Sequence, residues 1–132
     1  MNKVLIVDDS QPIRERLADL LIESGQIRIV GQTDNVQDGW EAVQFLQPDT
    51  VILDIRLPGS TGIALLQKIK AHCPQVTVIM LTNFDGAQYR RQCQRLGADY
   101  FLNKTLEFGK IVDIITGRPD NRMVGRDKPL KQ

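Results

Sequence analysis

The sequence has few of the residues that build disulfide, metal or triad chemistry. It contains two cysteines in 132 residues, Cys73 and Cys93, twenty positions apart and outside any C-x-x-C pair. That count favours a reduced, cytoplasmic protein with incidental thiols. A single histidine, His72, makes a histidine-based metal site or a catalytic triad implausible. Because His72 precedes Pro74 at the expected end of a helix, a surface position is predicted for it.

Long apolar runs and an excess of one charge are also missing. No stretch approaches the roughly 20 apolar residues that span a bilayer, and the four-residue apolar run near the start is too short for a signal peptide. The 17 basic and 16 acidic side chains create no overall field that would attract nucleic acid or a membrane surface. We therefore expect neither direct nucleic-acid binding nor membrane association.

What the sequence does contain is a regular alternation of two kinds of segment. Short runs rich in valine, isoleucine and leucine alternate with segments whose apolar residues recur at helical spacing. Such alternation predicts an α/β fold, a doubly wound parallel sheet with helices on both faces. The strands are expected at 4–7, 27–33, 51–53, 76–81 and 100–102, and the helices at 11–24, 36–46, 61–72, 86–96 and 106–116.

The periodicity ends before the chain does. Residues 1–117 have the size and pattern of one domain. Residues 118–132 contain five basic side chains, two acidic ones and two prolines. We expect this short basic C-terminal tail to be flexible.

Polar residues stand where four of the expected strands end. In an open α/β sheet, ligands bind beyond the carboxyl ends of the strands, so these residues should share one rim. Each has an ordinary structural explanation when taken alone, because an aspartate after a strand is usually a cap or a turn former. Their coincidence on four strands favours a site, composed of Asp8, Asp9, Asp54, Thr82 and Lys104.

These side chains suit phosphoryl chemistry. Three crowded carboxylates repel each other, and Mg²⁺, which prefers oxygen ligands, relieves that repulsion. A lysine and a threonine hydroxyl can hold phosphoryl oxygens, and an aspartate can accept the phosphoryl group covalently.

Four motifs resemble the receiver domain of response regulators in two-component signalling. They are VLIVDDS (4–10), VILDIRLPGSTGIALL (51–66), VIMLTN (78–83) and GADYFLNK (97–104), and the resemblance covers roughly residues 3 to 116. It implies the flavodoxin-like strand order 2-1-3-4-5 with five helices. It also implies a cytoplasmic signalling domain that catalyses only its own phosphorylation and dephosphorylation.

The resemblance also assigns roles to individual residues. Asp54 would take a phosphoryl group from a sensor histidine kinase or a histidine phosphotransfer protein. Thr82 and Lys104 would bind phosphoryl oxygens, and Thr82 and Phe101 would form a switch. The switch would alter the face made by the fourth helix, fifth strand and fifth helix, to control an unknown downstream protein or a homodimer. The implied Mg²⁺ ligands are Asp8, acting through a metal-bound water, Asp9, Asp54 and the carbonyl of Arg56.

The sequence departs from the family pattern at three places. Thr105 replaces the usual proline after the lysine, so we expect a trans Lys104–Thr105 bond and an altered loop into the last helix. Phe101 replaces a commoner tyrosine, and a bulky Phe84 follows Thr82 closely. Phe84, together with Arg56, is expected to shield a phosphoryl group on Asp54 from water and to slow its loss.

Several alternatives remain open at this stage. An aspartyl phosphatase of the haloacid dehalogenase kind is disfavoured, because its D-x-D pattern on the first strand is replaced here by the adjacent Asp8 and Asp9. A degenerate receiver that only binds proteins is disfavoured because all five site residues are present. Two possibilities stay open for a receiver domain of this kind: a stand-alone receiver, or the receiver half of a DNA-binding transcription regulator.

Overall fold

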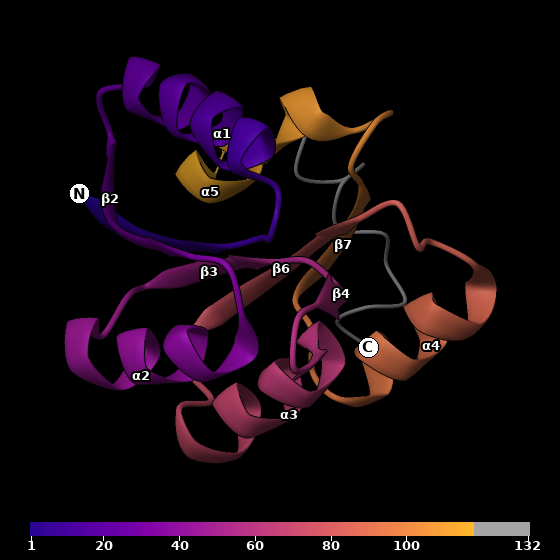
Figure 1. Ribbon diagram of the computed structural model, residues 1–132. Helices are drawn as coiled ribbons and strands as arrows, with labels where there is room; N and C mark the ends of the chain where they lie inside the picture. Colours follow the sequence, from indigo (N-terminus) through magenta and orange to yellow (C-terminus); the bar gives the residue numbers. More distant parts are fainter. Residues whose placement is uncertain (118–132) are drawn as a thin grey trace.

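Five parallel strands form the central sheet of the protein (Figure 1). The computed structural model describes residues 1–117, so the predicted flexible tail at 118–132 lies outside the described residues. The spatial order β2-β1-β3-β6-β7 is the predicted doubly wound order, with two short extra strands counted in the numbering. The five strands are β1 (Asn2–Val7), β2 (Ile27–Thr33), β3 (Thr50–Leu53), β6 (Thr77–Thr82) and β7 (Tyr100–Asn103).

The helices cover both faces of this sheet. One face carries α1 (Gln11–Glu23) and α5 (Ile111–Thr116), and the other carries α2 (Val36–Leu46), α3 (Gly62–His72) and α4 (Ala87–Arg95), as Figure 1 shows. Among the described helices, none is both long enough and apolar enough to cross a bilayer.

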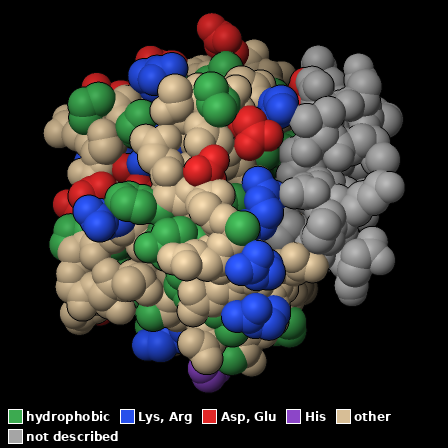
Figure 2. All heavy atoms as spheres, turned by 90° about the vertical axis from the view of Figure 1, so that its right-hand side faces the viewer, with side chains coloured by type: hydrophobic (Ala, Val, Ile, Leu, Met, Phe, Trp, Pro, Cys, Tyr) green, Lys and Arg blue, Asp and Glu red, His purple; other side chains and the backbone are tan. Residues whose placement is uncertain are grey.

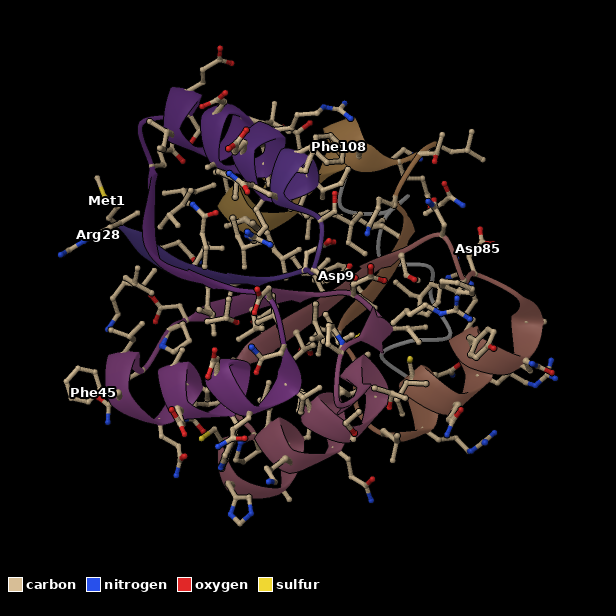
Figure 3. The ribbon with its side chains drawn as sticks, in the orientation of Figure 1. Met1, Asp9, Arg28, Phe45, Asp85 and Phe108 are labelled. Atoms are coloured by element: carbon tan, nitrogen blue, oxygen red, sulfur yellow. The ribbon has the colours of Figure 1, made fainter. Side chains whose placement is uncertain are left out.

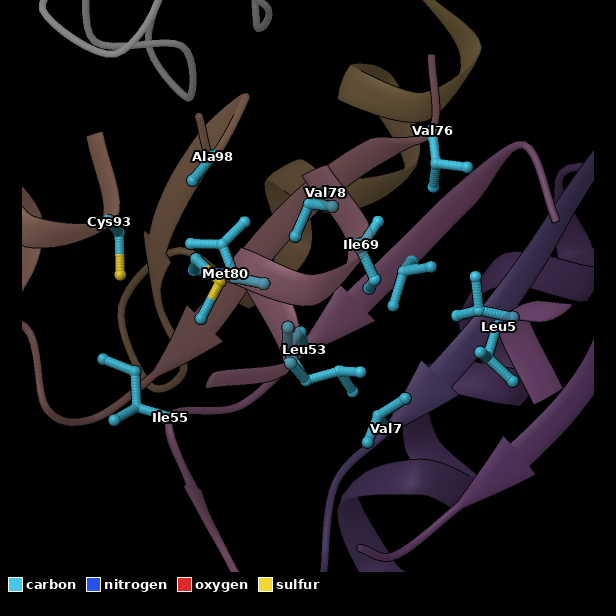
Figure 4. Packing of buried hydrophobic residues seen from close by; sticks show 14 of the residues in the cluster. Leu5, Val7, Leu53, Ile55, Ile69, Val76, Val78, Met80, Cys93 and Ala98 are labelled. Atoms are coloured by element: carbon cyan, nitrogen blue, oxygen red, sulfur yellow. The ribbon is translucent and has the colours of Figure 1, made fainter. Parts of the chain in front are cut away.

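The central strands are buried from both sides. In β1, Val4 and Ile6 point into the cluster under α1 and α5, while Leu5 and Val7 point into the cluster on the other face (Figure 4). All four side chains are fully buried. A strand with two apolar faces shows no alternation in sequence, which is why unbroken runs were the correct signal for a parallel sheet.

Capping residues place the first helix directly after the acidic pair. The Ser10 hydroxyl accepts a hydrogen bond from the Ile13 N–H at 3.4 Å, and Pro12 occupies the first turn. A serine cap satisfies one of the orphan N–H groups, and proline lacks an N–H that would need a partner there. The helix ends before Gly25, whose φ of 73° lies in the left-handed region that glycine tolerates. The predicted helix start and stop are confirmed.

The last helix begins later than predicted. Residues 106–116 were expected to be helical, but the chain first makes a turn and a short 3₁₀ segment, η1 (Phe108–Lys110), before α5. The Asn103 side chain closes this turn, since its Oδ1 accepts from the N–H groups of Thr105 at 2.8 Å and Leu106 at 2.7 Å. Leu106 lies in the turn and is 80% exposed. The Lys104–Thr105 bond is trans, as predicted.

A small antiparallel hairpin follows β3 and was not predicted. It pairs β4 (Arg56–Leu57) with β5 (Ser60–Thr61). Pro58 and Gly59 form its turn, and Gly59 has the positive φ, 85°, that a type II turn requires. The hairpin returns the chain to α3, whose first turn is capped by the Thr61 hydroxyl at 3.1 Å from the Ala64 N–H.

A buried ion pair at the opposite end of the sheet also escaped the sequence analysis. The Asp99 carboxylate accepts from the Lys70 ammonium and from the Val78 N–H, each at 2.9 Å. Lys70 also donates to the Val76 carbonyl at 2.6 Å. These bonds join the end of α3 to the starts of β6 and β7, far from the strand ends that carry the site, so their role is structural.

Candidate functional site

The predicted site residues meet at the carboxyl ends of the central strands, where Figure 3 labels Asp9. Asp8 follows β1 and Asp54 follows β3, and their side chains are only 4% and 7% exposed. Asp9 is exposed beside them. One carboxylate oxygen from each of these three residues lies within 4.8 Å of the others. The sequence therefore placed the acidic cluster correctly.

Lys104 lies between the two buried carboxylates. Its ammonium is 2.6 Å from Asp54 Oδ2 and 2.7 Å from Asp8 Oδ2. The other oxygen of each carboxylate accepts a backbone N–H, from Ile55 at 2.7 Å and from Ser10 at 2.8 Å. Buried charges persist only when they are paired and hydrogen-bonded in this way.

The charges of this cluster alter its protonation equilibria. Burial raises the pKa of Asp8 above 3.8, and the hydrogen bond from Lys104 opposes that rise without cancelling it. Burial alone would lower the pKa of Lys104, but its hydrogen bonds to Asp54 and Asp8 outweigh that effect, so its pKa is raised above 10.5. Lys104 is therefore a cation at neutral pH, and it balances part of the negative charge of the site.

The donor set fits a hard divalent cation. Three carboxylates supply the oxygen ligands that Mg²⁺ prefers, and Asp9 opens the cluster to solvent, where water ligands can complete the shell. Arg56, whose carbonyl was predicted as a further ligand, stands two residues after Asp54 in β4. That carbonyl ligand stays a prediction. The Arg56 side chain lies over the ring of Phe84, 4.4 Å from its centroid.

Thr82 and Phe101 occupy the interior beside the cluster. Thr82 is fully buried at the end of β6, and its hydroxyl accepts from the Phe84 N–H at 3.1 Å. Phe101 is 1% exposed, so its ring already points inward in this structure. The Arg90 guanidinium covers that ring at 4.8 Å from the centroid. The switch role of this pair stays a prediction.

Gly62 contributes to the candidate site, a role that the sequence analysis did not assign to it. A Cβ built on Gly62 would overlap the carbonyl oxygen of Asp54 and would lie 2.8 Å from the carbonyl carbon. The Gly62 N–H donates to the Ile55 carbonyl at 2.6 Å. The start of α3 thus packs directly against the backbone of Asp54, which no local sequence signal reveals.

A doubly wound sheet of this order, with acids, a threonine and a lysine at one rim, defines a flavodoxin-like domain with an acidic cluster that can hold a cation. The chain belongs to the response regulator receiver domain family, whose model matches residues 4–116. Receiver domains of this family are signalling domains of two-component systems, and the family identity and strand order predicted from the sequence are confirmed.

Similar proteins include regulators of several kinds. The chain is 33% identical to the transcriptional regulatory protein LnrK of Bacillus subtilis over 115 residues, which are 87% of this chain and 52% of LnrK. A DNA-binding response regulator of the LuxR family from Staphylococcus aureus superposes with a TM-score of 0.83 at 26% identity, covering 89% of this chain and 98% of that one. The chain spans about half the length of the curated relatives it matches.

One solved structure contains a similar protein bound to another protein, together with a metal ion and a beryllium fluoride group. It is the CheX-CheY-BeF3-Mg complex from Borrelia burgdorferi, with a TM-score of 0.79 and 26% identity, covering 93% of this chain and 87% of that one.

Proposed function

We propose that this chain is a phospho-accepting switch that takes a phosphoryl group onto Asp54. The observation that carries the proposal is the position of the Asp54 carboxylate, 2.6 Å from the Lys104 ammonium and within 4.8 Å of the oxygens of Asp8 and Asp9. A nucleophilic carboxylate, an adjacent cation and a set of oxygen ligands are the parts that phosphoryl transfer needs, because it relies on positioning and charge neutralisation.

Each residue has a role in this proposal. Asp8, Asp9, Asp54 and the Arg56 carbonyl would hold Mg²⁺, Asp8 through a water, and the ion supplies positive charge that offsets the negative oxygens when it is bound. A carboxylate oxygen of Asp54 bonds to phosphorus as the bond from phosphorus to the donor imidazole breaks. Lys104 would then hold one phosphoryl oxygen and Thr82 another.

The proposed donor is a sensor histidine kinase or a histidine phosphotransfer protein, as the family membership suggests. Phosphorylation would draw the Thr82 hydroxyl away from the Phe84 N–H and change the packing around Phe101. The surface of α4, β7 and α5 would report that change to a downstream protein or to a second copy of the chain.

A second candidate is the receiver half of a DNA-binding transcription regulator. It is favoured by the length of the relatives, since the matched region is 52% of LnrK. Reading the coding sequence beyond the codon for Gln132 in its genome distinguishes the two candidates. A DNA-binding domain in the same reading frame would make DNA the downstream target, and a stop codon would leave a protein target.

Phosphoryl uptake is the direct test of the first candidate. Incubation with Mg²⁺ and acetyl phosphate should add the mass of one phosphoryl group to the wild type and to Asp19→Asn, which changes an exposed aspartate on α1. Asp54→Asn should gain nothing, because an amide is not a nucleophile for this transfer. No adduct on the wild type, under conditions that label a known receiver, would refute the proposal. Steady turnover of small phosphate esters would instead indicate a phosphatase.

The lifetime of the phosphorylated form should depend on Phe84. The Arg56 guanidinium and the Phe84 ring stack at 4.4 Å beside the acceptor loop, where they can exclude the water that hydrolyses the acyl phosphate. Phe84→Ala should therefore shorten the half-life of the adduct several-fold, measured by mass spectrometry after removal of the donor. Phe45→Ala, which removes an equally large ring from an exposed position on α2, should leave it unchanged. A longer half-life for Phe84→Ala would contradict the shielding role.

A further inference from the structure

Two loops stay connected by hydrogen bonds beyond the point where the sheet ends. β6 and β7 pair as far as Thr82 and Asn103, and the Lys104 N–H then donates to the Thr82 carbonyl at 2.9 Å. From there the chain enters a first loop, 83–86, before α4, and a second loop, 104–107, before η1. Ladder hydrogen bonds end with the strands, so the two loops need other contacts to remain side by side.

Asn103 makes most of these contacts. Its Nδ2 donates to Asp85 Oδ2 in the first loop at 2.7 Å. Its Oδ1 accepts from the N–H groups of Thr105 and Leu106 in the second loop, at 2.8 and 2.7 Å. The Thr105 hydroxyl donates to Asn83 Oδ1 at 3.0 Å, which is a second bridge between the loops. We call this set of hydrogen bonds the clasp.

The clasp flanks both residues that would hold phosphoryl oxygens. Asn83 directly follows Thr82, and Lys104 stands between Asn103 and Thr105. The Lys104 side chain is long and has many rotamers, so the position of its ammonium depends on how firmly its backbone is held. Because the clasp bonds residues on both sides of Lys104 to the loop that follows Thr82, it limits the movement of the ammonium relative to the Thr82 hydroxyl.

The bonds of the clasp are exposed and individually weak. Asp85 lies at the right of Figure 3, on the side that faces the viewer in Figure 2, where acidic and basic side chains both reach solvent. Water competes for exposed hydrogen bonds, so each contributes little to the stability of the fold. Their effect on the spacing of two groups beside Asp54 is therefore a better account of the clasp than a contribution to stability.

We propose that Asn103 and Thr105 are positioning residues that hold Lys104 for phosphoryl transfer, an inference that rests on the proposed function. The clasp keeps the ammonium and the Thr82 hydroxyl at a spacing that lets each hold a different oxygen of one phosphoryl group on Asp54. Thr105 suits this role because it supplies an N–H and a hydroxyl, and the proline that is usual at its position has neither.

The same clasp should weaken Mg²⁺ binding. The Lys104 ammonium lies 2.7 and 2.6 Å from carboxylate oxygens of Asp8 and Asp54, which are proposed ligands of the ion. Two cations that share carboxylates repel each other. A loosened loop lets the ammonium move away as the ion binds, so loss of the clasp should tighten Mg²⁺ binding while it slows phosphoryl transfer. A general distortion of the site would weaken both.

The test compares labelling by acetyl phosphate at saturating Mg²⁺ with Mg²⁺ affinity measured by calorimetry, on the full 132-residue chain. Asn103→Ala should slow labelling of Asp54 roughly tenfold and should bind Mg²⁺ several-fold more tightly. Thr105→Val, which removes one hydroxyl at nearly constant shape, should slow labelling roughly threefold. The matched control, Thr116→Val, removes a hydroxyl that donates to the Val112 carbonyl at 2.8 Å, and should leave both quantities unchanged.

Exchanging the two bridging side chains tests whether the clasp itself is responsible. Asn103→Asp alone places two carboxylates against each other and should slow labelling. Asp85→Asn/Asn103→Asp reverses the bridging hydrogen bond, because the amide then lies in the first loop and the carboxylate in the second. That carboxylate can still accept from the N–H groups of Thr105 and Leu106. The labelling rate of the double variant should return to within about twofold of the wild type.

The outcomes separate this inference from the proposed function. A labelled wild type with equal rates in Asn103→Ala and Thr105→Val would overturn the positioning role. Slower labelling with weaker Mg²⁺ binding, or no recovery in the exchanged variant, would also overturn it. An unlabelled wild type would refute the proposed function, and tighter Mg²⁺ binding by Asn103→Ala would still show that the clasp restrains Lys104.

Discussion

Replacing Lys104 with methionine should lower the free energy of unfolding by about 3 kcal/mol at neutral pH without Mg²⁺. The variant keeps the aliphatic volume but leaves the carboxylates of Asp8 and Asp54 buried without the ammonium that now lies 2.7 and 2.6 Å from them. Removing one partner of a buried ion pair is costly because the remaining charge stays desolvated. Urea unfolding of wild type and variant measures the difference.

The pH dependence of this loss follows from the two raised pKa values. The pKa of Lys104 is above 10.5, so its stabilising contribution is fully present at neutral pH and is lost only as the pH rises through that higher value. The pKa of Asp8 is above its unfolded value of 3.8, so the folded state takes up a proton there more readily than the unfolded state. In Lys104→Met the deficit should therefore shrink as the pH falls from neutral toward that pKa.

Mg²⁺ and a surface lysine provide the controls for this prediction. If Mg²⁺ binds the carboxylates of the folded state, as proposed, adding it should recover part of the stability of Lys104→Met. Lys110→Met breaks a more exposed pair, with Glu107 at 3.3 Å, and should change stability by about 0.5 kcal/mol or less. A Lys104→Met deficit that is independent of both pH and Mg²⁺ would mean that lost packing, not unpaired charge, is its cause.

The strands and their polar ends were predictable because their signals are local. The run that contains Leu5 and Ile6 is apolar on both faces whatever the rest of the chain does, and parallel strands necessarily end on one rim. Asp8, Asp54 and Thr82 were found by reading the residue after each run. Predicting that these residues lie together thus needed only the order of elements and the chemistry of the side chains at their ends.

The features that were missed depend on contacts between distant segments. The apolar residues of 106–116 predicted one helix, but the chain first makes a turn that the Asn103 side chain closes by accepting from the N–H groups of Thr105 and Leu106, and α5 begins only at Ile111. Asp99 and Lys70 are 29 positions apart, and their pairing needs the finished sheet. The inward position of Phe101 is likewise set by its neighbours in the core, since the same residue could face solvent at a strand end.

Replacing Gly62 with alanine should lower the free energy of unfolding and also displace Asp54. The added methyl would overlap the Asp54 carbonyl, a backbone atom that cannot rotate away, so either α3 or the strand end that carries Asp54 must move. We expect a loss of about 3 kcal/mol in the free energy of unfolding, at the upper end of overpacking costs. The shift should also slow acetyl phosphate labelling, because Asp54 would leave its position beside Lys104.

Two other glycines separate steric overlap from backbone strain in this experiment. Gly109→Ala meets nothing within 4 Å and has no positive φ, so it should be neutral or slightly stabilising. Gly59→Ala also meets nothing within 4 Å but has a φ of +85°, so it should cost about 1 kcal/mol through the left-handed conformation alone. If Gly62→Ala cost no more than Gly59→Ala, the close packing of α3 on the Asp54 backbone would not be what fixes the Asp54 carboxylate. A cost well above Gly59→Ala, with slowed labelling, would show that Gly62 holds the Asp54 backbone in place.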